Sequence, residues 1–463
     1  MNLNSLKHIY FLGIGGIGMS ALARFFASQG ITVSGYDRTR TPLCEKLERE
    51  GMTIHYTENI GLIPKDIDLV VYTPAIPKDF AEFVHLQKTN IPILKRSEVL
   101  GIITQSMIGV CIAGTHGKTT ISTLIAHLLT QSSVKCNAFL GGISRNYNTN
   151  LVLSETSKIA VIEADEFDRS FLKLHPQIAV ISSIDADHLD IYGSKETMEK
   201  SFSEFANLVP KKGFLFQKYG TPNFGIPCKT YHLSDTNANY FTSNLRIENG
   251  MYCFDFNAPG GSWKDMIMTY PGLHNVENAV IAIVVAHLLG AAETEIREGL
   301  KTFQGIKRRF DVHIKTESLV YIDDYAHHPR EIEACIKSVK NLFPNRKITG
   351  IFQPHLYTRT RDFADEFAQS LSLLDTLILL DIYPAREKPI EGVTSEMLLE
   401  KCTCPNKILA ATEAQSTNSA QIKSNLLDLL KTQPLDVLLT IGAGDIDQTV
   451  NPIIEFLKSK SHQ

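Results

Sequence analysis

Short apolar runs alternate along this chain with longer segments whose apolar residues recur at helical spacing. Residues 8–12 form an apolar run, residues 19–29 repeat at helical spacing, and residues 31–37 form a second run that ends in an acid. Short apolar runs bounded by turn residues are typical of buried strands. The spacing of the apolar residues in the segment between the two runs is typical of a helix. The pattern predicts a βαβ unit. Further strands at 69–72 and 91–94 extend it to a domain that ends near residue 105.

The same alternation continues through the rest of the chain. In the second segment we expect strands at 110–113, 159–162 and 178–181 and helices at 121–129 and 278–289. Residues 213–269 are richer in Tyr, Phe, Asn and Gly, which indicates an antiparallel edge or an insertion. In the third segment we expect strands at 319–322, 348–352, 376–380 and 437–441. Strands separated by helices are typical of parallel sheets covered by helices.

The prediction is therefore an α/β chain of three domains. Residues 1–105 would form a Rossmann-like domain, residues 106–309 a P-loop-type parallel sheet, and residues 310–463 a second Rossmann-like domain. A chain of 463 residues is long enough for two or three domains.

Composition narrows the function classes. The net charge of −4, with both signs mixed, gives no basic footprint for nucleic acid. No apolar run reaches the roughly 18 residues of a membrane span, and the first residues lack a signal-peptide pattern. The eight cysteines are scattered, as expected for reduced thiols. We expect a cytoplasmic protein, either a monomer or a weak homodimer.

A glycine-rich turn between a predicted strand and a predicted helix carries the strongest chemical signal. It consists of Gly114, Thr115, His116, Gly117, Lys118, Thr119 and Thr120. Such a turn points backbone N–H groups and a helix N-terminus at a phosphate. Lys118 can reach the outer phosphates, and the Thr119 hydroxyl can ligate Mg²⁺. The general pattern has Gly where this chain has Ala113, so the loop is a shortened variant. A purely structural turn would not require Gly, Lys, Thr and helix to follow in this order.

A second glycine-rich turn lies in the first βαβ unit. Gly15, Gly16 and Gly18 follow the first strand, and Asp37 ends the second. Glycines for a tight turn, a helix N-terminus for a pyrophosphate and a carboxylate for a ribose hydroxyl make up the dinucleotide fingerprint. NAD(P) or any pyrophosphate-linked nucleoside, including a UDP-sugar, fits this pattern equally well. A structural glycine turn is the alternative.

Carboxylates and a histidine follow two strands of the second segment. Glu163 is the first carboxylate after the strand at 159–162, so we select it as a Mg²⁺ ligand. Asp165, Glu166 and Asp168 follow it, and some of these belong to a solvated turn. His188 stands among three aspartates after the next strand and fits a second metal position, although Mg²⁺ prefers oxygen ligands.

Polar clusters also occur near the end of the second segment and within the third segment. His274, Asn275 and Asn278 gather at the start of an apolar helix, where amides can contact an adenine edge or merely cap the helix. The third segment has clusters at 308–311, 323–329 and 353–362. We take the last two to follow neighbouring strands. Their His, Tyr, Arg and Asp residues suit an anionic or zwitterionic ligand.

Taken together, these motifs resemble the Mur ligase family over about residues 8–460. The resemblance rests on the glycine turn, the phosphate loop and six further motifs: Glu-Ala-Asp-Glu at 163–166, Asp-His-Leu-Asp at 187–190, the cluster at 271–278, Arg-Arg-Phe at 308–310, and the runs at 323–329 and 353–361. It implies that ATP phosphorylates a substrate carboxylate and that an amine displaces the phosphate. The chain is most similar to the branch that adds L-alanine to UDP-N-acetylmuramate.

The resemblance also implies roles for single residues. Lys118, Glu163 and His188 would be catalytic, with Thr119 and Glu163 on one Mg²⁺ and His188 on the other. ATP would contact the whole phosphate loop, with His274, Asn275 and Asn278 at adenine, Arg309 at the phosphates and Asp324 at the ribose. UDP would bind at Gly15, Gly16, Gly18 and Asp37. L-Alanine would lie among Tyr325, His327, His355 and Arg359. Closure of the third domain would then gate catalysis.

Two positions depart from the family pattern. Leu356 stands where members often carry Arg, so any anion contact from that position is absent. Ser203 stands where several sister ligases carry a carbamylated Lys, and the nearest lysine is Lys200. We therefore expect no carbamate, in agreement with the alanine-adding branch.

Three rival functions remain open at this point. A murein-peptide recycling ligase would add a tripeptide to the same acceptor. An NAD(P)-dependent oxidoreductase would use the first domain but leaves the phosphate loop unexplained. A non-enzymatic nucleotide-binding module leaves the acidic and histidine-bearing strand ends unexplained.

Overall fold

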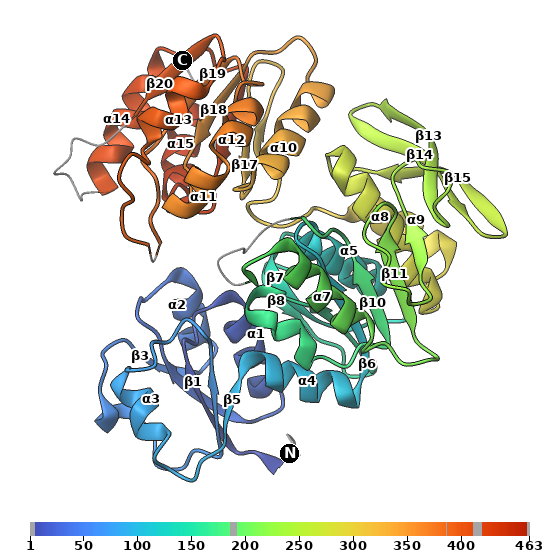
Figure 1. The fold of residues 1–463 in the computed structure, drawn as a ribbon, viewed down its shortest axis with the longest axis vertical. Helices are drawn as coiled ribbons and strands as arrows, with labels where there is room; N and C mark the ends of the chain where they lie inside the picture. Colours follow the sequence, from blue (N-terminus) through green and yellow to red (C-terminus); the bar gives the residue numbers. More distant parts are fainter. Residues whose placement is uncertain (1–4, 186–191, 386, 411–418, 461–463) are drawn as a thin grey trace. The chain divides into compact units, whose positions relative to one another are not determined.

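The computed structural model describes residues 5–185, 192–385, 387–410 and 419–460. The chain divides into two compact units (Figure 1). The N-terminal unit comprises Met1–Tyr270 with Asn275–Gln304, and the C-terminal unit comprises Pro271–His274 with Gly305–Gln463. Each unit is described by itself.

The first sheet of the N-terminal unit is fully parallel, with the strand order β3-β2-β1-β4-β5. Its strands are β1 (His8–Leu12), β2 (Thr32–Tyr36), β3 (Thr53–His55), β4 (Leu69–Tyr72) and β5 (Ile93–Lys95). Its helices are α1 (Ile17–Ser28), α2 (Pro42–Arg49), the short η2 (Ile60–Leu62), α3 (Ala81–Leu86) and α4 (Arg96–Ser106). The order reverses between β1 and β4, and ligands of such sheets bind at that reversal, beyond the carboxyl ends of the strands.

The second sheet has the order β12-β11-β10-β6-β9-β7-β8, and β8 is its antiparallel edge. Its strands are β6 (Ile108–Ala113), β7 (Asn137–Ser144), β8 (Thr149–Val152), β9 (Ile159–Glu163), β10 (Ile178–Ile181), β11 (Phe214–Lys218) and β12 (Lys229–Tyr231). Its helices are α5 (Lys118–Gln131), η3 (Phe167–Lys173), α7 (Lys195–Ala206), α8 (Leu273–Leu288) and α9 (Glu293–Thr302). Because β9 and β10 flank β6, both strand ends lie beside the loop that follows β6.

A small antiparallel sheet is inserted between β12 and α8. It consists of β13 (Phe241–Glu248), β14 (Met251–Ala258) and β15 (Gly261–Met268). The antiparallel insertion expected within 213–269 is confirmed.

The C-terminal unit contains a six-stranded sheet of order β16-β17-β21-β18-β19-β20. Its strands are β16 (Asp311–Lys315), β17 (Val320–Asp324), β18 (Ile348–Phe352), β19 (Thr376–Leu379), β20 (Asn406–Leu409) and β21 (Val437–Ile441). Its helices are α10 (Pro329–Leu342), α11 (Tyr357–Asp362), α12 (Ala364–Leu371), α13 (Ser395–Lys401), α14 (Ser419–Lys431) and α15 (Asp447–Lys460). Only β16 runs antiparallel to its neighbour.

The predicted α/β class is confirmed, but one prediction about this last sheet is wrong. We expected β17 and β18 to be neighbours, whereas β21 pairs with both and separates them. Parallel strands are joined by crossovers, so the order along the chain does not fix the order in the sheet.

Helix α1 of the first sheet packs on the β7–β8 hairpin of the second. The Arg24 guanidinium donates to Asn150 Oδ1 at 2.5 Å, and the Asn150 amide donates to Ser20 Oγ at 2.9 Å. Arg24 is 8% exposed and Asn150 is fully buried. The rings of Phe25 and Phe139 lie 5.3 Å apart in the same contact. A single apolar cluster runs through both sheets, which explains why they form one compact unit.

Among the described residues, no helix is long and apolar enough to cross a bilayer.

Helix α5 is anchored by a buried histidine. His127, 1% exposed, contacts the Tyr147 hydroxyl and the Thr302 hydroxyl at 3.0 Å each through its two ring nitrogens. Burial lowers the pKa of His127 to about 4. The unfolded chain, with an ordinary histidine pKa, therefore binds a proton that the folded chain rejects between about pH 6.5 and pH 4.

We predict that acid destabilises the protein partly through His127. The contribution of neutral His127 to the free energy of unfolding is fully present above the pKa that the histidine has in the unfolded chain. It is lost as the pH falls toward 4, and the loss reaches up to roughly 3 kcal/mol. His127→Gln keeps a donor and an acceptor but does not titrate. Between pH 7.5 and pH 5, its melting temperature should fall less than that of the parent protein. His85→Gln, at an exposed histidine, is the control. Equal falls for all three proteins would disprove the assignment.

Candidate functional site

The phosphate loop has the strand–turn–helix geometry that its sequence predicts. Strand β6 ends at Ala113, and α5 begins at Lys118. Gly114 and Gly117 adopt φ values of +132° and +82°, which side-chain-bearing residues rarely take. A Cβ at Gly114 would collide with the Ser182 hydroxyl, and one at Gly117 would lie 2.9 Å from Asn278 Oδ1. Both glycines are therefore needed for this loop to close against its neighbours.

The carboxyl end of β10 holds the loop from one side. The Thr115 backbone N–H donates to Ser183 O at 3.1 Å, and the His116 N–H donates to Ser183 Oγ at 2.8 Å. The Ser182 hydroxyl donates to the His116 carbonyl. His116 Nε2 lies 3.3 Å from the Asp185 carboxylate. The sequence interpretation missed both serines, because hydroxyl residues after a strand look like any turn.

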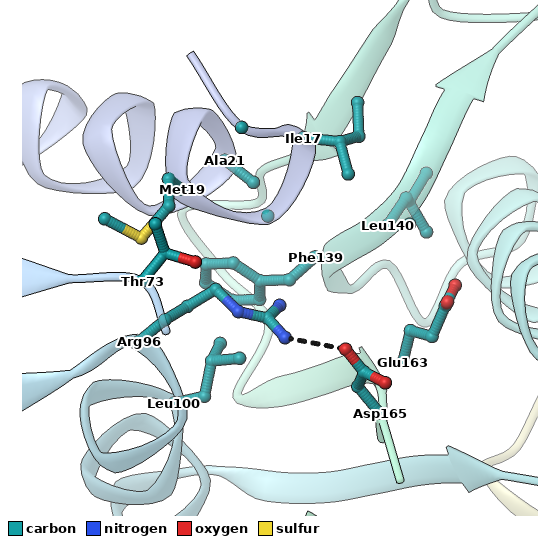
Figure 2. A pocket seen from close by; sticks show the side chains of 13 residues that line it. Ile17, Met19, Ala21, Thr73, Arg96, Leu100, Phe139, Leu140, Glu163 and Asp165 are labelled. Atoms are coloured by element: carbon teal, nitrogen blue, oxygen red, sulfur yellow. Dashed lines mark hydrogen bonds and ion pairs between the residues drawn. The ribbon is translucent and has the colours of Figure 1, made fainter. Parts of the chain in front are cut away.

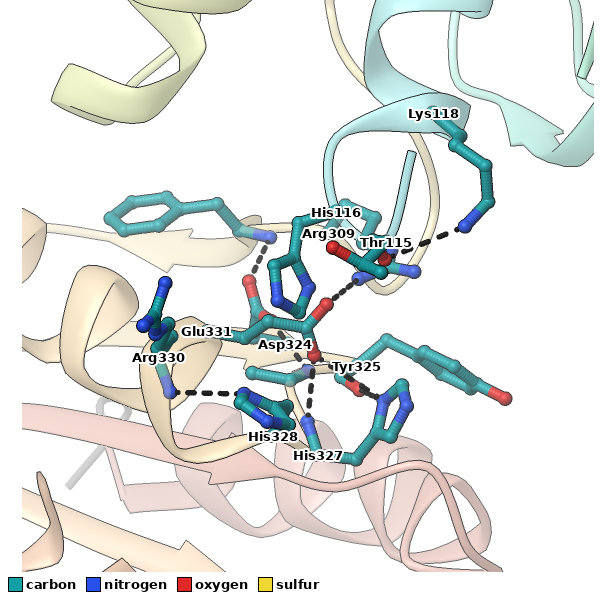
Figure 3. A network of polar contacts seen from close by, with 12 residues as sticks. Thr115, His116, Lys118, Arg309, Asp324, Tyr325, His327, His328, Arg330 and Glu331 are labelled. Atoms are coloured by element: carbon teal, nitrogen blue, oxygen red, sulfur yellow. Dashed lines mark hydrogen bonds and ion pairs between the residues drawn. The ribbon is translucent and has the colours of Figure 1, made fainter. Parts of the chain in front are cut away.

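Lys118 forms a buried ion pair with a carboxylate from β9's end. Its Nζ donates to Glu166 Oε1 at 2.8 Å and to the Gly114 carbonyl at 2.5 Å. The Lys118 side chain is 13% exposed and that of Glu166 is 1% exposed. Burial alone would lower the pKa of Lys118, but the nearby carboxylates, Glu166 foremost, raise it overall. The lysine is thus held as a cation at the mouth of the loop, beside Thr115 (Figure 3).

Glu163 presents a carboxylate oxygen that has no partner among the described residues. Its Oε2 is buried and accepts no hydrogen bond. A Cβ at Gly141 of β7 would collide with this carboxylate, so only glycine leaves room for it. A buried, unpaired carboxylate oxygen beside the phosphate loop fits a divalent cation.

The structure describes two of the three predicted Mg²⁺ ligands, Thr119 and Glu163. Thr119 follows Lys118 in the first turn of α5. His188 lies outside the described residues. Within the described ranges, no group of three or more His, Cys, Asp or Glu side chains forms a metal cluster by itself.

The remaining acids after β9 contact the end of the first sheet. Asp165 pairs with Arg96 at 3.3 Å, and Asp168 pairs with Lys95 at 3.5 Å. Asp168 and Arg169 both adopt left-handed φ, an uncommon conformation that concentrates at functional sites.

A pocket of about 250 Å³ lies between α1, the start of α4, the middle of β7 and the end of β9 (Figure 2). Its lining includes Gly16 and Gly18 of the first glycine turn and Glu163 of the second sheet. The Gly15 N–H donates to Asp37 Oδ2 at 2.8 Å, so Asp37 closes this turn. The pocket connects the predicted UDP-binding turn with the unpaired carboxylate.

The adenine candidates lie in the first turns of α8. The Asn278 amide donates to Asn275 Oδ1 at 3.3 Å, and both side chains are at least nine-tenths buried. Asn278 also lies against Gly117, as described above. His274 belongs to the part of α8 that groups with the C-terminal unit.

The C-terminal unit brings together its predicted amino-acid-binding residues. The rings of Tyr325 and His327 lie 5.4 Å apart, and those of His327 and His355 lie 6.1 Å apart. Arg359 contacts His355 Nδ1 at 3.4 Å. Burial lowers the pKa of His327, and the nearby Glu331 carboxylate offsets only part of this effect. Tyr383, which the sequence interpretation missed, stacks on His355 at 5.7 Å.

Arg309 and Asp324 lie in the same unit (Figure 3). The Arg309 guanidinium lies 4.9 Å from the Tyr325 ring centre and 3.8 Å from Glu331. The two Asp324 oxygens accept from the backbone N–H groups of Phe310 and Ala326, at 2.7 Å each. Burial raises the pKa of Asp324 to about 6. Asp324 therefore organises the backbone at the end of β17.

Leu356, the position that departs from the family pattern, has φ +72°. A leucine rarely adopts this conformation, so the backbone there is strained. It precedes α11, which carries Arg359.

Comparisons with known proteins match the whole chain. Three family descriptions match in succession: "Mur ligase family, catalytic domain" at 8–107, "Mur ligase middle domain" at 112–286 and "Mur ligase, glutamate ligase domain" at 308–444. A UDP-N-acetylmuramate–L-alanine ligase of Parabacteroides distasonis is 50% identical, covering 99% of this chain and 98% of the relative. One from Porphyromonas gingivalis is 47% identical over 98% of this chain and its own full length.

Solved structures agree with this picture. The crystal structure of a UDP-N-acetylmuramate–alanine ligase from Thermotoga maritima has a TM-score of 0.80 at 26% identity, covering 98% of this chain and 99% of that one. A murein peptide ligase from Psychrobacter arcticus has a TM-score of 0.69 at 21% identity, covering 97% and 98%, and shows the shared fold alone.

We predict that Glu166 weakens the binding of phosphate groups in the absence of metal. Its negative charge competes with a polyphosphate for Lys118, so Glu166→Gln should bind ADP roughly 5- to 10-fold more tightly in EDTA. Isothermal titration calorimetry measures this directly. Glu204→Gln removes an exposed acid paired with Arg169 and should leave ADP affinity unchanged. Unchanged or weaker binding by Glu166→Gln would contradict the prediction.

Proposed function

Because the chain belongs to the Mur ligase family, we propose that it joins L-alanine to the carboxylate of UDP-N-acetylmuramate, with cleavage of ATP to ADP and phosphate. This reaction serves peptidoglycan precursor synthesis. The observation that carries the proposal is full-length identity of about one half to curated ligases of that name. The phosphate loop with its buried Lys118 supports it independently.

The chemical difficulty is that one anion must attack another. The substrate carboxylate attacks the γ-phosphorus of ATP, the bond to the β-phosphate oxygen breaks, and an acyl phosphate forms. The amine of L-alanine then attacks the carbonyl carbon and expels phosphate. A fixed cation at the transferring group lowers the barrier to the first step, because it stabilises negative charge without solvent reorganisation. We assign that part to Lys118.

We assign the remaining roles as follows. Backbone N–H groups of the phosphate loop, other than those of Thr115 and His116, which donate to Ser183, hold the ATP phosphates. Asn275 and Asn278, with His274, contact adenine, while Arg309 and Asp324 contact the phosphates and ribose. Thr119, Glu163 and His188 would hold Mg²⁺, which when bound neutralises charge on the phosphates. The unpaired Glu163 oxygen supports this assignment.

We further assign one substrate to each segment of the chain. Residues 1–105 bind the UDP moiety through Gly15, Gly16, Gly18 and Asp37. Residues 106–309 bind ATP, and residues 310–463 bind L-alanine. There Arg359 pairs with its carboxylate, in the company of Tyr325, His327 and His355. We place the enzyme in the cytoplasm, as a monomer or weak homodimer.

The rival functions are not favoured. Eight relatives at 44–50% identity are named as alanine-adding enzymes. The peptide-ligase structures are only 21% and 23% identical to this chain. An oxidoreductase would not require the phosphate loop.

One assay tests the proposal. Purified protein is mixed with ATP, Mg²⁺, UDP-N-acetylmuramate and single amino acids, and phosphate release is followed. Release should depend on L-alanine and on the UDP-linked acceptor. Release with the tripeptide alone, or with no amino acid, would refute it.

Lys118→Ala should abolish phosphate release, a loss of more than about 100-fold, because a preorganised cation at the transferring phosphoryl group is removed. Calorimetry should show unchanged binding of UDP-N-acetylmuramate. Lys211→Ala, at an exposed lysine, should behave as the parent protein. Loss of acceptor binding by a folded Lys118→Ala protein would mean that the loop does not serve ATP alone.

A further inference from the structure

Arg96 lies where the first glycine turn meets the second sheet. It is the first residue of α4, directly after β5, and it lines the pocket between α1 and Glu163 (Figure 2). Its guanidinium lies in the space beside Gly18, where a Cβ would collide with Nη1. The missing side chain at Gly18 therefore lets Arg96 reach the first turn of α1.

The charges around this pocket leave one place for an anion. Arg96 is the one cationic side chain among the described residues that line the pocket, while Glu163 and Asp165 are acids. An anionic group would be repelled by Glu163 and attracted to Arg96. Backbone N–H groups at the start of α1 add to this attraction, since its first turn carries no acid and no side chain caps it.

Asp165 occupies only one of the Arg96 N–H donors, so most of the guanidinium donors remain available for a ligand. One nitrogen, Nη2, contacts Asp165 Oδ2 at 3.3 Å, and the side chains are 23% and 40% exposed. Asp165 also accepts from the Phe167 N–H at 3.1 Å through its other oxygen. A half-exposed ion pair with a single contact is worth little, so a better acceptor can replace it. A phosphate group is such an acceptor, because it matches the planar fork of a guanidinium.

We infer that Arg96 binds the diphosphate of the UDP-linked substrate, which takes the place of Asp165 at the guanidinium. The inference rests on the proposed function for the identity of the substrate. It adds a binding residue that lies outside the glycine turn and belongs to the helix leading into the second sheet. Arg96 would thereby set how far the substrate reaches toward Glu163.

Calorimetry with three ligands tests the inference. UDP, uridine and UDP-N-acetylmuramate are titrated into the parent protein, Arg96→Ala and Arg96→Lys. Arg96→Ala should weaken UDP and UDP-N-acetylmuramate by the same factor, about 10- to 100-fold, and leave uridine unchanged. Arg96→Lys should be intermediate, because it keeps the charge but loses the fork. Lys95→Ala removes the neighbouring cation, which pairs with Asp168, and should leave all three affinities unchanged.

Asp165→Asn supplies a second, opposite readout. It removes the competing carboxylate, so UDP affinity should rise or stay equal. A fall in UDP affinity would show that the ion pair, rather than a free guanidinium, shapes the site, and would overturn the inference.

Other outcomes are equally decisive. If Arg96→Ala weakens UDP-N-acetylmuramate but not UDP, Arg96 contacts the sugar or its carboxylate, and the diphosphate assignment is wrong. If uridine weakens to the same extent, or if no ligand weakens, Arg96 has no diphosphate contact. Thermal melting without ligand identifies a folding defect, and Arg96→Lys then carries the test. UDP binding is measured without turnover, so absence of L-alanine-dependent phosphate release would refute the proposed function and leave this inference standing.

Discussion

The buried ion pair between Lys118 and Glu166 is the interaction on which the rest of the site depends. A ligase of this kind must bring a carboxylate to a triphosphate, and its own strand ends contribute further carboxylates. Burying a lysine beside them costs desolvation energy, which the carboxylates offset by raising its pKa. The Glu166 carboxylate thus holds the cation at the loop, and under the proposed function phosphate oxygens would replace that contact.

The four residues at the end of β9 connect two parts of the N-terminal unit. Glu163 faces the pocket beside the first glycine turn, Asp165 pairs with Arg96, and Glu166 pairs with Lys118. Because Asp165 and Glu166 lie in the irregular backbone between β9 and η3, this short segment can reach several partners. The pocket beside the first glycine turn and the phosphate loop therefore share the short segment at the end of β9. Such an arrangement holds reacting groups in position, which is where much of the rate enhancement of a two-substrate enzyme originates.

How far the sequence predicts this structure depends on how local each signal is. The bounds of β1, β4, β10, β18 and β21 match the apolar runs, because strands buried on both faces read as continuous apolar segments. The place of β21 between β17 and β18 is a long-range pairing that no local pattern carries. Sequence patterns did not single out Glu166, Ser182, Ser183 and Tyr383, nor Arg96, which we infer to bind the diphosphate, for the same reason. Each acts through a partner distant in sequence, and each sits in an ordinary-looking turn or helix start.

The central claim is that the phosphate loop delivers the γ-phosphoryl group of ATP to the acceptor carboxylate. It is tested most directly by following oxygen. UDP-N-acetylmuramate labelled with ¹⁸O in its carboxylate is converted with L-alanine and ATP, and the released phosphate is examined by ³¹P NMR. The account predicts one ¹⁸O atom in each phosphate, because the carboxylate oxygen attacks phosphorus and leaves with it. Unlabelled phosphate would show that water or another group accepts the phosphoryl group, and would contradict the account.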